Sequence, residues 1–230
     1  MPTGTILERF LDERRAAGRI SSTLIPAPGQ YLLAHDPASY APLPVALFPA
    51  GTAADGFLVA PPLPHAWLPG QTLTLRGPLG RGFRLPASAR KVALVAWKLA
   101  PAVLLALLAP ALAQNASLAL LCDDPPDDLP SDVEVQPLEA LPEVFAWADY
   151  VALHVERESL AGVVERLGSA APARGPQEAE VLVGAPVPCG GLAECGVCAV
   201  HVKNEVRLAC KDGPVFRYDE VKRLFDIWEV

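Results

Sequence analysis

The sequence contains no concentration of positive charge. Its 19 lysine and arginine residues are outnumbered by 26 aspartate and glutamate residues, and the formal net charge is −7. No basic stripe is present that could neutralise the phosphates of a nucleic acid, so we expect no nucleic-acid partner. The G-x-S-x-G, H-E-x-x-H and P-loop motifs are also missing. The sequence therefore does not predict the hydrolase, zinc-protease or nucleotide-binding sites that these motifs form.

The sequence has little that indicates export or membrane insertion. Residues 1–20 carry acidic side chains and lack the apolar core of a secretory signal. The longest apolar stretch, residues 92–113, has the length of a membrane span, but Lys98, Pro101 and Pro110 interrupt it. A strand followed by a helix accounts for this stretch better. We therefore expect a cytoplasmic protein without membrane association, in a compartment where stable disulfides are rare.

Cysteine is scarce, with five residues in 230, yet four of the five lie close together near the C-terminus. The fifth, Cys122, ends an apolar run and is expected to be a small buried side chain. Clustered cysteines in a cytoplasmic protein indicate metal binding or redox chemistry. The four follow the pattern C-x5-C-x2-C-x11-C and are Cys189, Cys195, Cys198 and Cys210.

This spacing favours an iron–sulfur centre over the alternatives. Zinc ribbons usually present two separate C-x2-C pairs, and Cys210 has no near partner in the sequence. Three cysteines in one loop with a fourth on a later strand is the layout of plant-type [2Fe–2S] clusters, C-x4-C-x2-C…C. The first gap here is five residues rather than four. Zinc and disulfides remain alternatives, and we expect the four cysteines to be the ligands of a [2Fe–2S] cluster.

Glycines in the same stretch suit a loop that wraps a cluster. Gly190, Gly191 and Gly196 let the backbone amides around them point at sulfur, and such hydrogen bonds stabilise negative charge and adjust the reduction potential. Residues 199–210 are predicted to form a hairpin that returns Cys210 to the loop. We therefore expect these three glycines to be the cofactor-binding positions.

The chain is predicted to be an α+β multidomain protein. Residues 1–20 show an amphipathic helical pattern, and residues 24–85 contain short apolar runs separated by glycine and proline, which is typical of a small antiparallel β-barrel. From residue 90 onward strands expected at 91–97, 117–122, 132–136 and 149–155 alternate with helices, the first of which is expected to start at Pro101, as in a doubly wound α/β sheet. A Pro- and Gly-rich linker at residues 168–179 precedes the cysteine-containing tail, and residues 219–230 form an amphipathic segment.

The segment LRGPLGRGF, residues 75–83, is predicted to be a tight turn of the antiparallel unit. Its G-x-x-G-x-G spacing after a β segment is only a weak indication of a phosphate loop. Three arginines in and beside this turn are available to an anionic ligand or an acidic partner: Arg76, Arg81 and Arg84.

The residues CGGLAECGVCAV…ACKDGPVF near the C-terminus resemble the electron-transfer (iron–sulfur/flavin) subunit of heterodimeric dihydroorotate dehydrogenase, a family of the ferredoxin–NADP reductase-like superfamily. The resemblance is specific over the last forty residues and weaker in PGQYLLA (28–34) and LRGPLGRGF (75–83). It implies a hetero-oligomer with a flavin-containing catalytic subunit and a role in pyrimidine biosynthesis. The cluster would relay single electrons between flavins in the two subunits.

Two departures from the family pattern concern the flavin and nicotinamide sites. The segment PLPVALFPAG (42–51) lacks the arginine and serine that hold FAD in the family, and WKLAPAVLL (97–105) replaces a glycine-rich loop that brings backbone close to a pyrophosphate. FAD therefore remains a candidate cofactor, although no segment of the sequence matches the FAD motif of the family. The resemblance divides the chain into an N-terminal helix with an FAD-type β-barrel (1–85), a degenerate NAD-type α/β domain (86–172) and a [2Fe–2S] domain (173–230).

The leading hypothesis is an iron–sulfur electron-transfer subunit that relays single electrons to or from a partner oxidoreductase such as a dihydroorotate dehydrogenase-type flavoprotein. Such a component of an oxidoreductase complex needs no catalytic acid, base or nucleophile of its own. One alternative is an FAD-containing, NAD(P)H-oxidising diaphorase subunit with a variant flavin pocket. The other is a non-catalytic scaffold whose cluster is structural or senses redox state.

Overall fold

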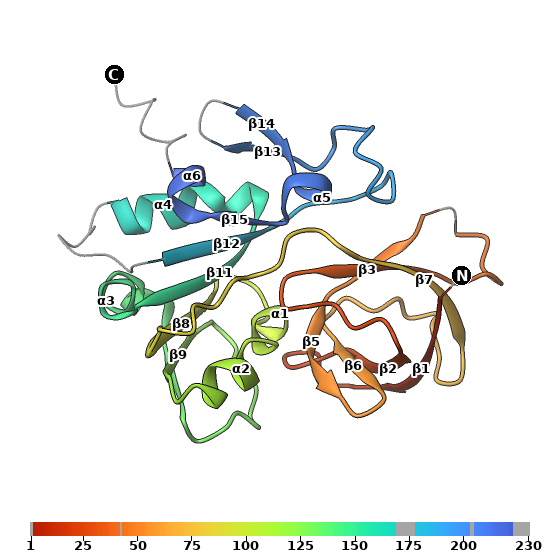
Figure 1. Ribbon diagram of the computed structural model, residues 1–230, viewed down its shortest axis with the longest axis horizontal. Coiled ribbons are helices and arrows are strands. Elements are labelled where there is room, and N and C mark those ends of the chain that lie inside the picture. Colours follow the sequence, from red (N-terminus) through yellow and green to blue (C-terminus); the bar gives the residue numbers. More distant parts are fainter. Residues whose placement is uncertain (1, 42, 169–177, 203–204, 223–230) are drawn as a thin grey trace.

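The computed structural model describes residues 2–41, 43–168, 178–202 and 205–222, and it contains two large sheets and a small hairpin (Figure 1). The first sheet has seven antiparallel strands in the order β4-β3-β7-β1-β2-β6-β5. The strands are β1 (Thr3–Arg9), β2 (Gly18–Ser22), β3 (Tyr31–His35), β4 (Val45–Leu47), β5 (Pro49–Ala53), β6 (Gly56–Val59) and β7 (Thr72–Leu79). The predicted antiparallel domain is confirmed. A closed barrel is not, because no pairing between β4 and β5 is found in the described residues.

The predicted N-terminal helix is wrong, since its residues form β1 and β2. Ile6 and Ile20 lie opposite each other in the β1–β2 pair, and both side chains are fully buried. The apolar residues that suggested one helical face do not share an environment, because Leu11 is fully exposed in the turn between the strands. Pairing with distant strands therefore outweighed the local helical pattern, as tertiary contacts often do.

The second sheet has six strands in the order β10-β9-β8-β11-β12-β15, of which the first five are parallel and β15 is antiparallel to β12. From the central β8 the chain builds outward through β9 and β10, and then crosses to β11 and β12 on the other side. This is the doubly wound order predicted from the sequence. The strands are β8 (Lys91–Ala96), β9 (Ser117–Leu121), β10 (Val133–Gln136), β11 (Tyr150–Glu156), β12 (Glu178–Gly184) and β15 (Val215–Arg217).

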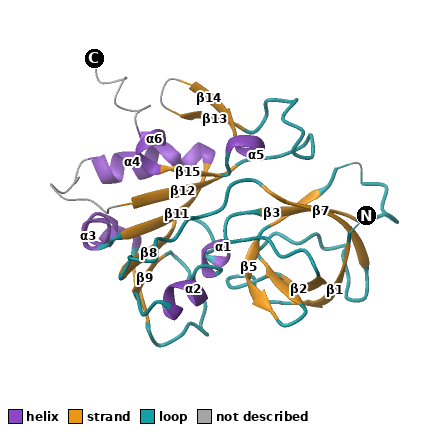
Figure 2. Cartoon of the chain, viewed as in Figure 1, coloured by secondary structure: helices purple, strands orange, loops and turns teal. Residues whose placement is uncertain are grey.

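Helices cover both faces of this sheet (Figure 2). Alternate residues of β8 point to opposite sides: Leu94 packs with the first two helices, whereas Val95 packs with the next two. These pairs are α1 (Ala102–Leu105) with α2 (Leu108–Ala113), and α3 (Leu141–Trp147) with α4 (Leu160–Gly168). Residues 92–113 thus divide into a strand and two short helices. In the described part of the chain, no helix has both the length and the apolar character required to cross a membrane.

The residues after the predicted boundary at 172 and 173 do not all lie apart from the α/β domain. Strands β12 and β15 both belong to the α/β sheet, because their apolar residues complete its core. The remaining elements lie beside that sheet. They are the hairpin β13 (Ala199–Val202) and β14 (Glu205–Leu208), α5 (Ala209–Asp212) and α6 (Tyr218–Lys222). Most of the predicted linker, the turn of the hairpin and the end of the amphipathic tail fall outside the described residues.

A buried carboxylate ties the connection between the two sheets to β12. Glu180 is 4% exposed and accepts hydrogen bonds from the Tyr150 hydroxyl and the Arg84 backbone N–H, each at 2.7 Å. We expect Glu180→Ala to lower the free energy of unfolding by about 1–3 kcal/mol, because the buried Tyr150 hydroxyl and the part-buried Arg84 N–H lose their acceptor. Urea unfolding measures this loss. Glu178→Ala, at an exposed position of the same strand, is the control, and an equal loss in both variants would contradict the role of Glu180.

Candidate metal centre

The segment that follows β12 carries three of the four clustered cysteines on a loop, residues 188–198, which we call the cysteine loop. The loop leaves the carboxyl end of β12 and runs to β13 at one end of the molecule (Figure 1). Cys189 is half-buried, Cys195 is exposed and Cys198 is buried. The fourth, Cys210, lies buried in α5, directly after the hairpin. All five cysteines of the chain are free thiols, including the buried Cys122, so the disulfide alternative finds no support.

The structure brings the four predicted ligands together as two pairs. Cys195 lies beside Cys189 and lowers the pKa of its thiol, and Cys198 lies beside Cys210 and raises the pKa of its thiol. The pairs are close enough to interact, because charge on Cys189 contributes to raising the pKa of Cys210, after burial and Cys198. Among the described residues no group of three or more His, Cys, Asp or Glu side chains has the geometry of a single-ion site. Four cysteine thiols near one another are the donor set of an iron–sulfur cluster or of a zinc ion.

Backbone amides of the cysteine loop point at sulfur. The N–H groups of Leu192, Glu194 and Cys195 donate to Cys189, and the amide of Glu194 is the main reason that the pKa of Cys189 falls to about 6. The N–H of Ala193 donates to Cys210, whose pKa nevertheless rises to about 12, chiefly because of burial and the neighbouring Cys198. Such amides stabilise thiolate charge and would do the same for a cluster.

The predicted glycines shape this loop rather than supply the observed donors. Gly190, Gly191 and Gly196 have φ values of 62°, 72° and 72°, in the left-handed region that glycine adopts readily. Ala193 also has a positive φ of 62°, which no residue preference in the sequence indicated. The chain reversals at these positions turn the amides of residues 192–195 inward. The role of the glycines in holding a cofactor therefore remains a prediction.

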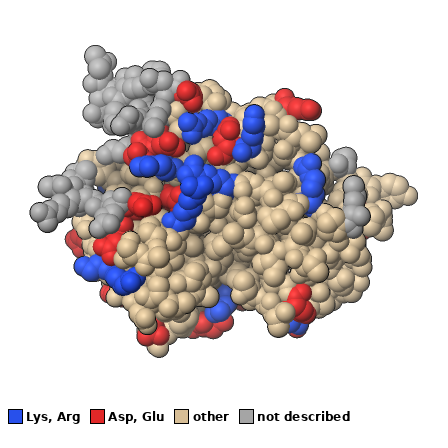
Figure 3. Space-filling view, viewed as in Figure 1, with Lys and Arg blue, Asp and Glu red and all other residues tan. Residues whose placement is uncertain are grey.

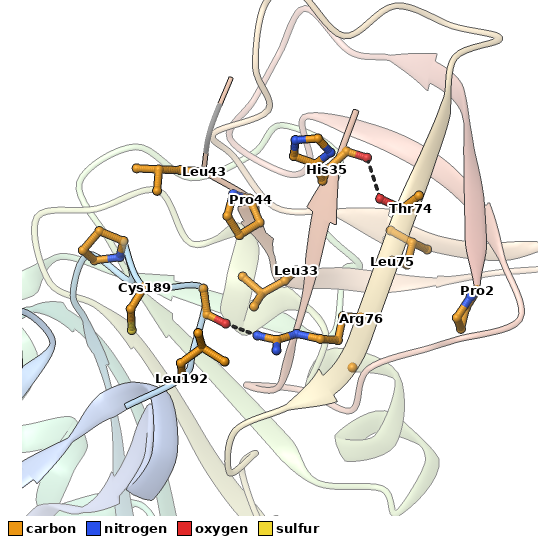
Figure 4. A pocket seen from close by; sticks show the side chains of 13 residues that line it. Pro2, Leu33, His35, Leu43, Pro44, Thr74, Leu75, Arg76, Cys189 and Leu192 are labelled. Atoms are coloured by element: carbon orange, nitrogen blue, oxygen red, sulfur yellow. Dashed lines mark hydrogen bonds between the residues drawn. The ribbon is translucent and has the colours of Figure 1, made fainter. Parts of the chain in front are cut away.

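Side chains from both domains anchor the cysteine loop and the cysteine-bearing segments next to it, and the sequence analysis assigned this role to none of them. Arg76 of β7 donates a hydrogen bond to the Gly190 carbonyl, as Figure 4 shows. The Tyr31 hydroxyl of β3 donates to the Cys210 carbonyl at 3.4 Å. From the α/β domain, Arg157, which directly follows β11, donates to the carbonyls of Val197 and Ala199 at 2.5 and 3.2 Å. Only Arg76 carried a sequence signal, as one of three arginines available to an anion or an acidic partner.

A cavity of about 580 Å³ opens beside Cys189 (Figure 4). Its walls are mostly apolar and come from the antiparallel domain and the cysteine loop. Leu43 and Leu192, which are 51% and 57% exposed, form part of its rim. Exposed apolar side chains beside a redox-active sulfur are typical of a surface that another protein covers.

A second cavity, of about 500 Å³, lies between the two domains at the carboxyl ends of β11 and β12 and reaches Cys210. Ligands of doubly wound sheets bind at this edge, so it is the place to test for FAD. The lining residues include no lysine or arginine, and Glu156 adds negative charge. Six lining residues are prolines, which have no N–H to donate: Pro44, Pro61, Pro62, Pro186, Pro188 and Pro214.

The nearby helix α1 also differs from a phosphate-binding helix. All four of its residues are buried, and the helix packs against β5 of the antiparallel domain. The second cavity and α1 therefore lack the cationic and glycine-rich features that a dinucleotide diphosphate requires. This edge of the sheet does not fit the diphosphate of FAD, although the apolar cavity has room for an uncharged ring.

Comparison with known proteins supports the cluster site and the fold. Residues 189–222, which contain all four clustered cysteines, match the family described as the iron–sulfur cluster binding domain of dihydroorotate dehydrogenase B. No curated protein sequence matches the chain.

Solved structures share the fold at low sequence identity. The NADH-dependent reduced ferredoxin–NADP oxidoreductase structure, described for flavin-based electron bifurcation, is 18% identical with a TM-score of 0.65 over 84% of this chain and 79% of that chain. An Amycolatopsis cytochrome P450 reductase is 16% identical with a TM-score of 0.59, covering 78% of this chain and 68% of that one. The ferredoxin reductase in carbazole 1,9a-dioxygenase is 18% identical with a TM-score of 0.54, and the match covers 75% of this chain and 64% of that one. The predicted resemblance is thus confirmed for residues 189–222, which match the iron–sulfur cluster binding domain of dihydroorotate dehydrogenase B, and the fold is that of the ferredoxin–NADP oxidoreductase and ferredoxin reductase structures.

Proposed function

We propose that the chain is an iron–sulfur electron-transfer subunit that passes single electrons to or from a flavin-containing dehydrogenase. The observation that supports this most directly is the two cysteine pairs, Cys189 with Cys195 and Cys198 with Cys210, inside a loop whose amides point at sulfur. We propose these four residues as ligands of a [2Fe–2S] cluster, which when bound would supply one-electron redox chemistry.

The protein's own contribution is to hold the ligands and to shield them unequally. Cys198 and Cys210 are 1% and 6% exposed and pack with the apolar core of the α/β domain. Cys195 is exposed and Cys189 lines the cavity beside Arg76. The four ligands therefore have a protected side toward the core and an accessible side at the surface, where an electron has a short path to a partner.

The same accessible side offers a docking surface for the partner. We propose that the partner covers the exposed apolar rim formed by Leu43 and Leu192. In Figure 3 the visible surface over the antiparallel domain carries few charged side chains, whereas charged side chains gather over the α/β domain. A weakly charged apolar surface next to the ligands suits a hetero-oligomer with a dehydrogenase subunit. The partner's substrate, dihydroorotate by family resemblance, belongs to the same proposal.

Analysis of anaerobically purified protein tests this function. We expect about two irons and two acid-labile sulfides per chain, a visible spectrum without flavin bands, and a rhombic EPR signal after dithionite reduction. Zinc without iron would overturn the proposal. A bound flavin that NADH or NADPH reduces would instead support the diaphorase alternative. An intact cluster that no flavoprotein partner can reduce or oxidise would support a structural or sensing role.

A further inference from the structure

Arg76 connects the antiparallel domain to the first half of the cysteine loop. Its Nη2 donates to the carbonyl of Gly190, the residue that follows Cys189, across 114 positions of sequence. The same nitrogen lies 3.6 Å from the point that a Cβ on Gly191 would occupy. Figure 4 shows the side chain extending from β7 toward the loop, next to Leu33. A guanidinium group is therefore fixed beside the peptide units adjacent to Cys189.

The charge of Arg76 is not neutralised by an ion pair with any carboxylate in the described residues. Arg157 provides a useful contrast because it also donates to loop carbonyls, those of Val197 and Ala199. The guanidinium of Arg157, however, forms an ion pair with Glu158 at 2.9 Å. Both arginines anchor the loop, but only Arg76 leaves its positive charge available to it.

The surroundings of Arg76 are partly apolar, although the residue itself is exposed. The cavity that it lines has apolar walls, including Leu33, Pro44 and Leu192. The partner proposed above would exclude water from this cavity, and the charge of Arg76 would then act over a longer range than in water. Because Gly190 and Gly191 both have a positive φ, the hydrogen bond to the Gly190 carbonyl also helps to fix a loop conformation that few residues adopt unaided.

We propose that Arg76 sets the reduction potential of the cluster held by the cysteine loop, through its unpaired positive charge and its contact with Gly190. The inference rests on the proposed function, since it requires a cluster to be bound. Reduction adds one electron, supplied by dithionite in the test below or by a flavin partner, to a centre that four thiolates already make negative. A fixed positive charge nearby stabilises the reduced state more than the oxidised state and raises the potential.

EPR-monitored redox titration of the full chain tests this role. Arg76→Gln keeps a donor near Gly190 but removes the charge, and we expect the reduced-to-oxidised ratio at a given potential to fall about tenfold, or ~59 mV for one electron. Arg76→Lys keeps the charge, so we expect a shift of less than about threefold. Arg157→Gln, which removes a charge already paired with Glu158, is the matched control and should change the ratio less than Arg76→Gln.

A second variant keeps the proposal testable if Arg76→Gln does not retain the cluster. Thr74 and Arg76 lie two positions apart on β7 and both line the cavity, so their side chains share one face of the strand. Thr74→Glu therefore places a carboxylate beside Arg76 while leaving its contact with Gly190 available. We expect this variant to lower the potential in the same direction as Arg76→Gln, and more at low ionic strength than at high ionic strength.

The outcomes separate this inference from the proposed function. Wild-type protein without iron and sulfide would overturn the proposed function itself. Wild-type protein with a normal cluster, but with a potential that neither Arg76→Gln nor Thr74→Glu changes, would overturn only the role of Arg76. Equal shifts in Arg76→Gln and Arg76→Lys would also overturn it, because they would show that the charge is not the cause.

Discussion

Replacement of Cys198 by serine is expected to abolish cluster binding, with bound iron falling to near zero, while the two sheets stay folded. Serine is a poor ligand for iron compared with a soft thiolate, and Cys198 is one of the two buried cysteines of the loop region. The loss should be large, because Cys198 is one of the four proposed ligands and is the neighbour of another, Cys210. Iron and sulfide analysis measures it.

Cys122→Ser provides the matched control for this prediction. Cys122 is also buried, at 4% exposure, but lies at the end of β9 and packs with α/β core residues away from the cysteine loop. We expect this variant to lose some stability and no iron. Full iron content in Cys198→Ser would rule out the proposed ligand set, and iron loss in Cys122→Ser would show that general destabilisation explains the result.

Hydrogen exchange of Cys198→Ser gives a further expected result. The predicted division at residues 172 and 173 places β12 and β15 with the cysteine-containing domain, but both are strands of the α/β sheet. We therefore expect lost protection in the loop and the β13–β14 hairpin, with protection retained in β8 and β11. Loss of protection across all the strands would contradict this division.

The second large effect is expected at the proposed docking surface. Leu192 lies in the cysteine loop, is 57% exposed and lines the cavity beside Cys189. Leu192→Glu would place a charge in the apolar rim, which the partner would have to desolvate. We expect electron transfer between the subunits to slow by about tenfold or more, as a loss of about 1.4 kcal/mol of binding would produce. Stopped-flow reduction by the partner dehydrogenase measures the rate.

Leu68→Glu is the control for docking, since Leu68 has a similar exposure of 61% and precedes β7 outside the cavity. It should leave the inter-subunit rate unchanged. The iron content of Leu192→Glu must also match that of the wild type, so that a slower rate reports on docking. A normal rate in Leu192→Glu, or an equal reduction in both variants, would contradict the position of the docking surface.

Local sequence patterns were sufficient for much of the α/β domain. The predicted strands at 91–97, 117–122, 132–136 and 149–155 match β8, β9, β10 and β11 within a residue or two. Three of them, β8, β9 and β11, are short apolar runs, and burial on both faces requires that pattern, whereas the edge strand β10 alternates apolar and polar residues. The helix predicted after Pro101 begins there as α1, because proline suits the start of a helix.

The N-terminal segment shows where local patterns fail. Residues 1–20 carry apolar residues at helical spacing, but Ile6 is buried by pairing with Ile20 in a neighbouring strand. Whether such a segment becomes a helix or a strand depends on the partner available to it. That partner is a property of the whole fold, and β1 also pairs with β7, which begins at residue 72.

The sequence by itself determined the identity and spacing of the four cysteines and the glycines that let their loop turn, because ligand chemistry and backbone freedom are local properties of residues. Only the tertiary structure decided which thiols form pairs, which amides point at sulfur and which side chains hold the loop. Arg76 reaches the loop from 114 positions away in the chain, and Tyr31 reaches the fourth cysteine, Cys210, from 179 positions away. Contacts of this kind arise when two sheets pack against each other, so no spacing in the sequence could reveal them.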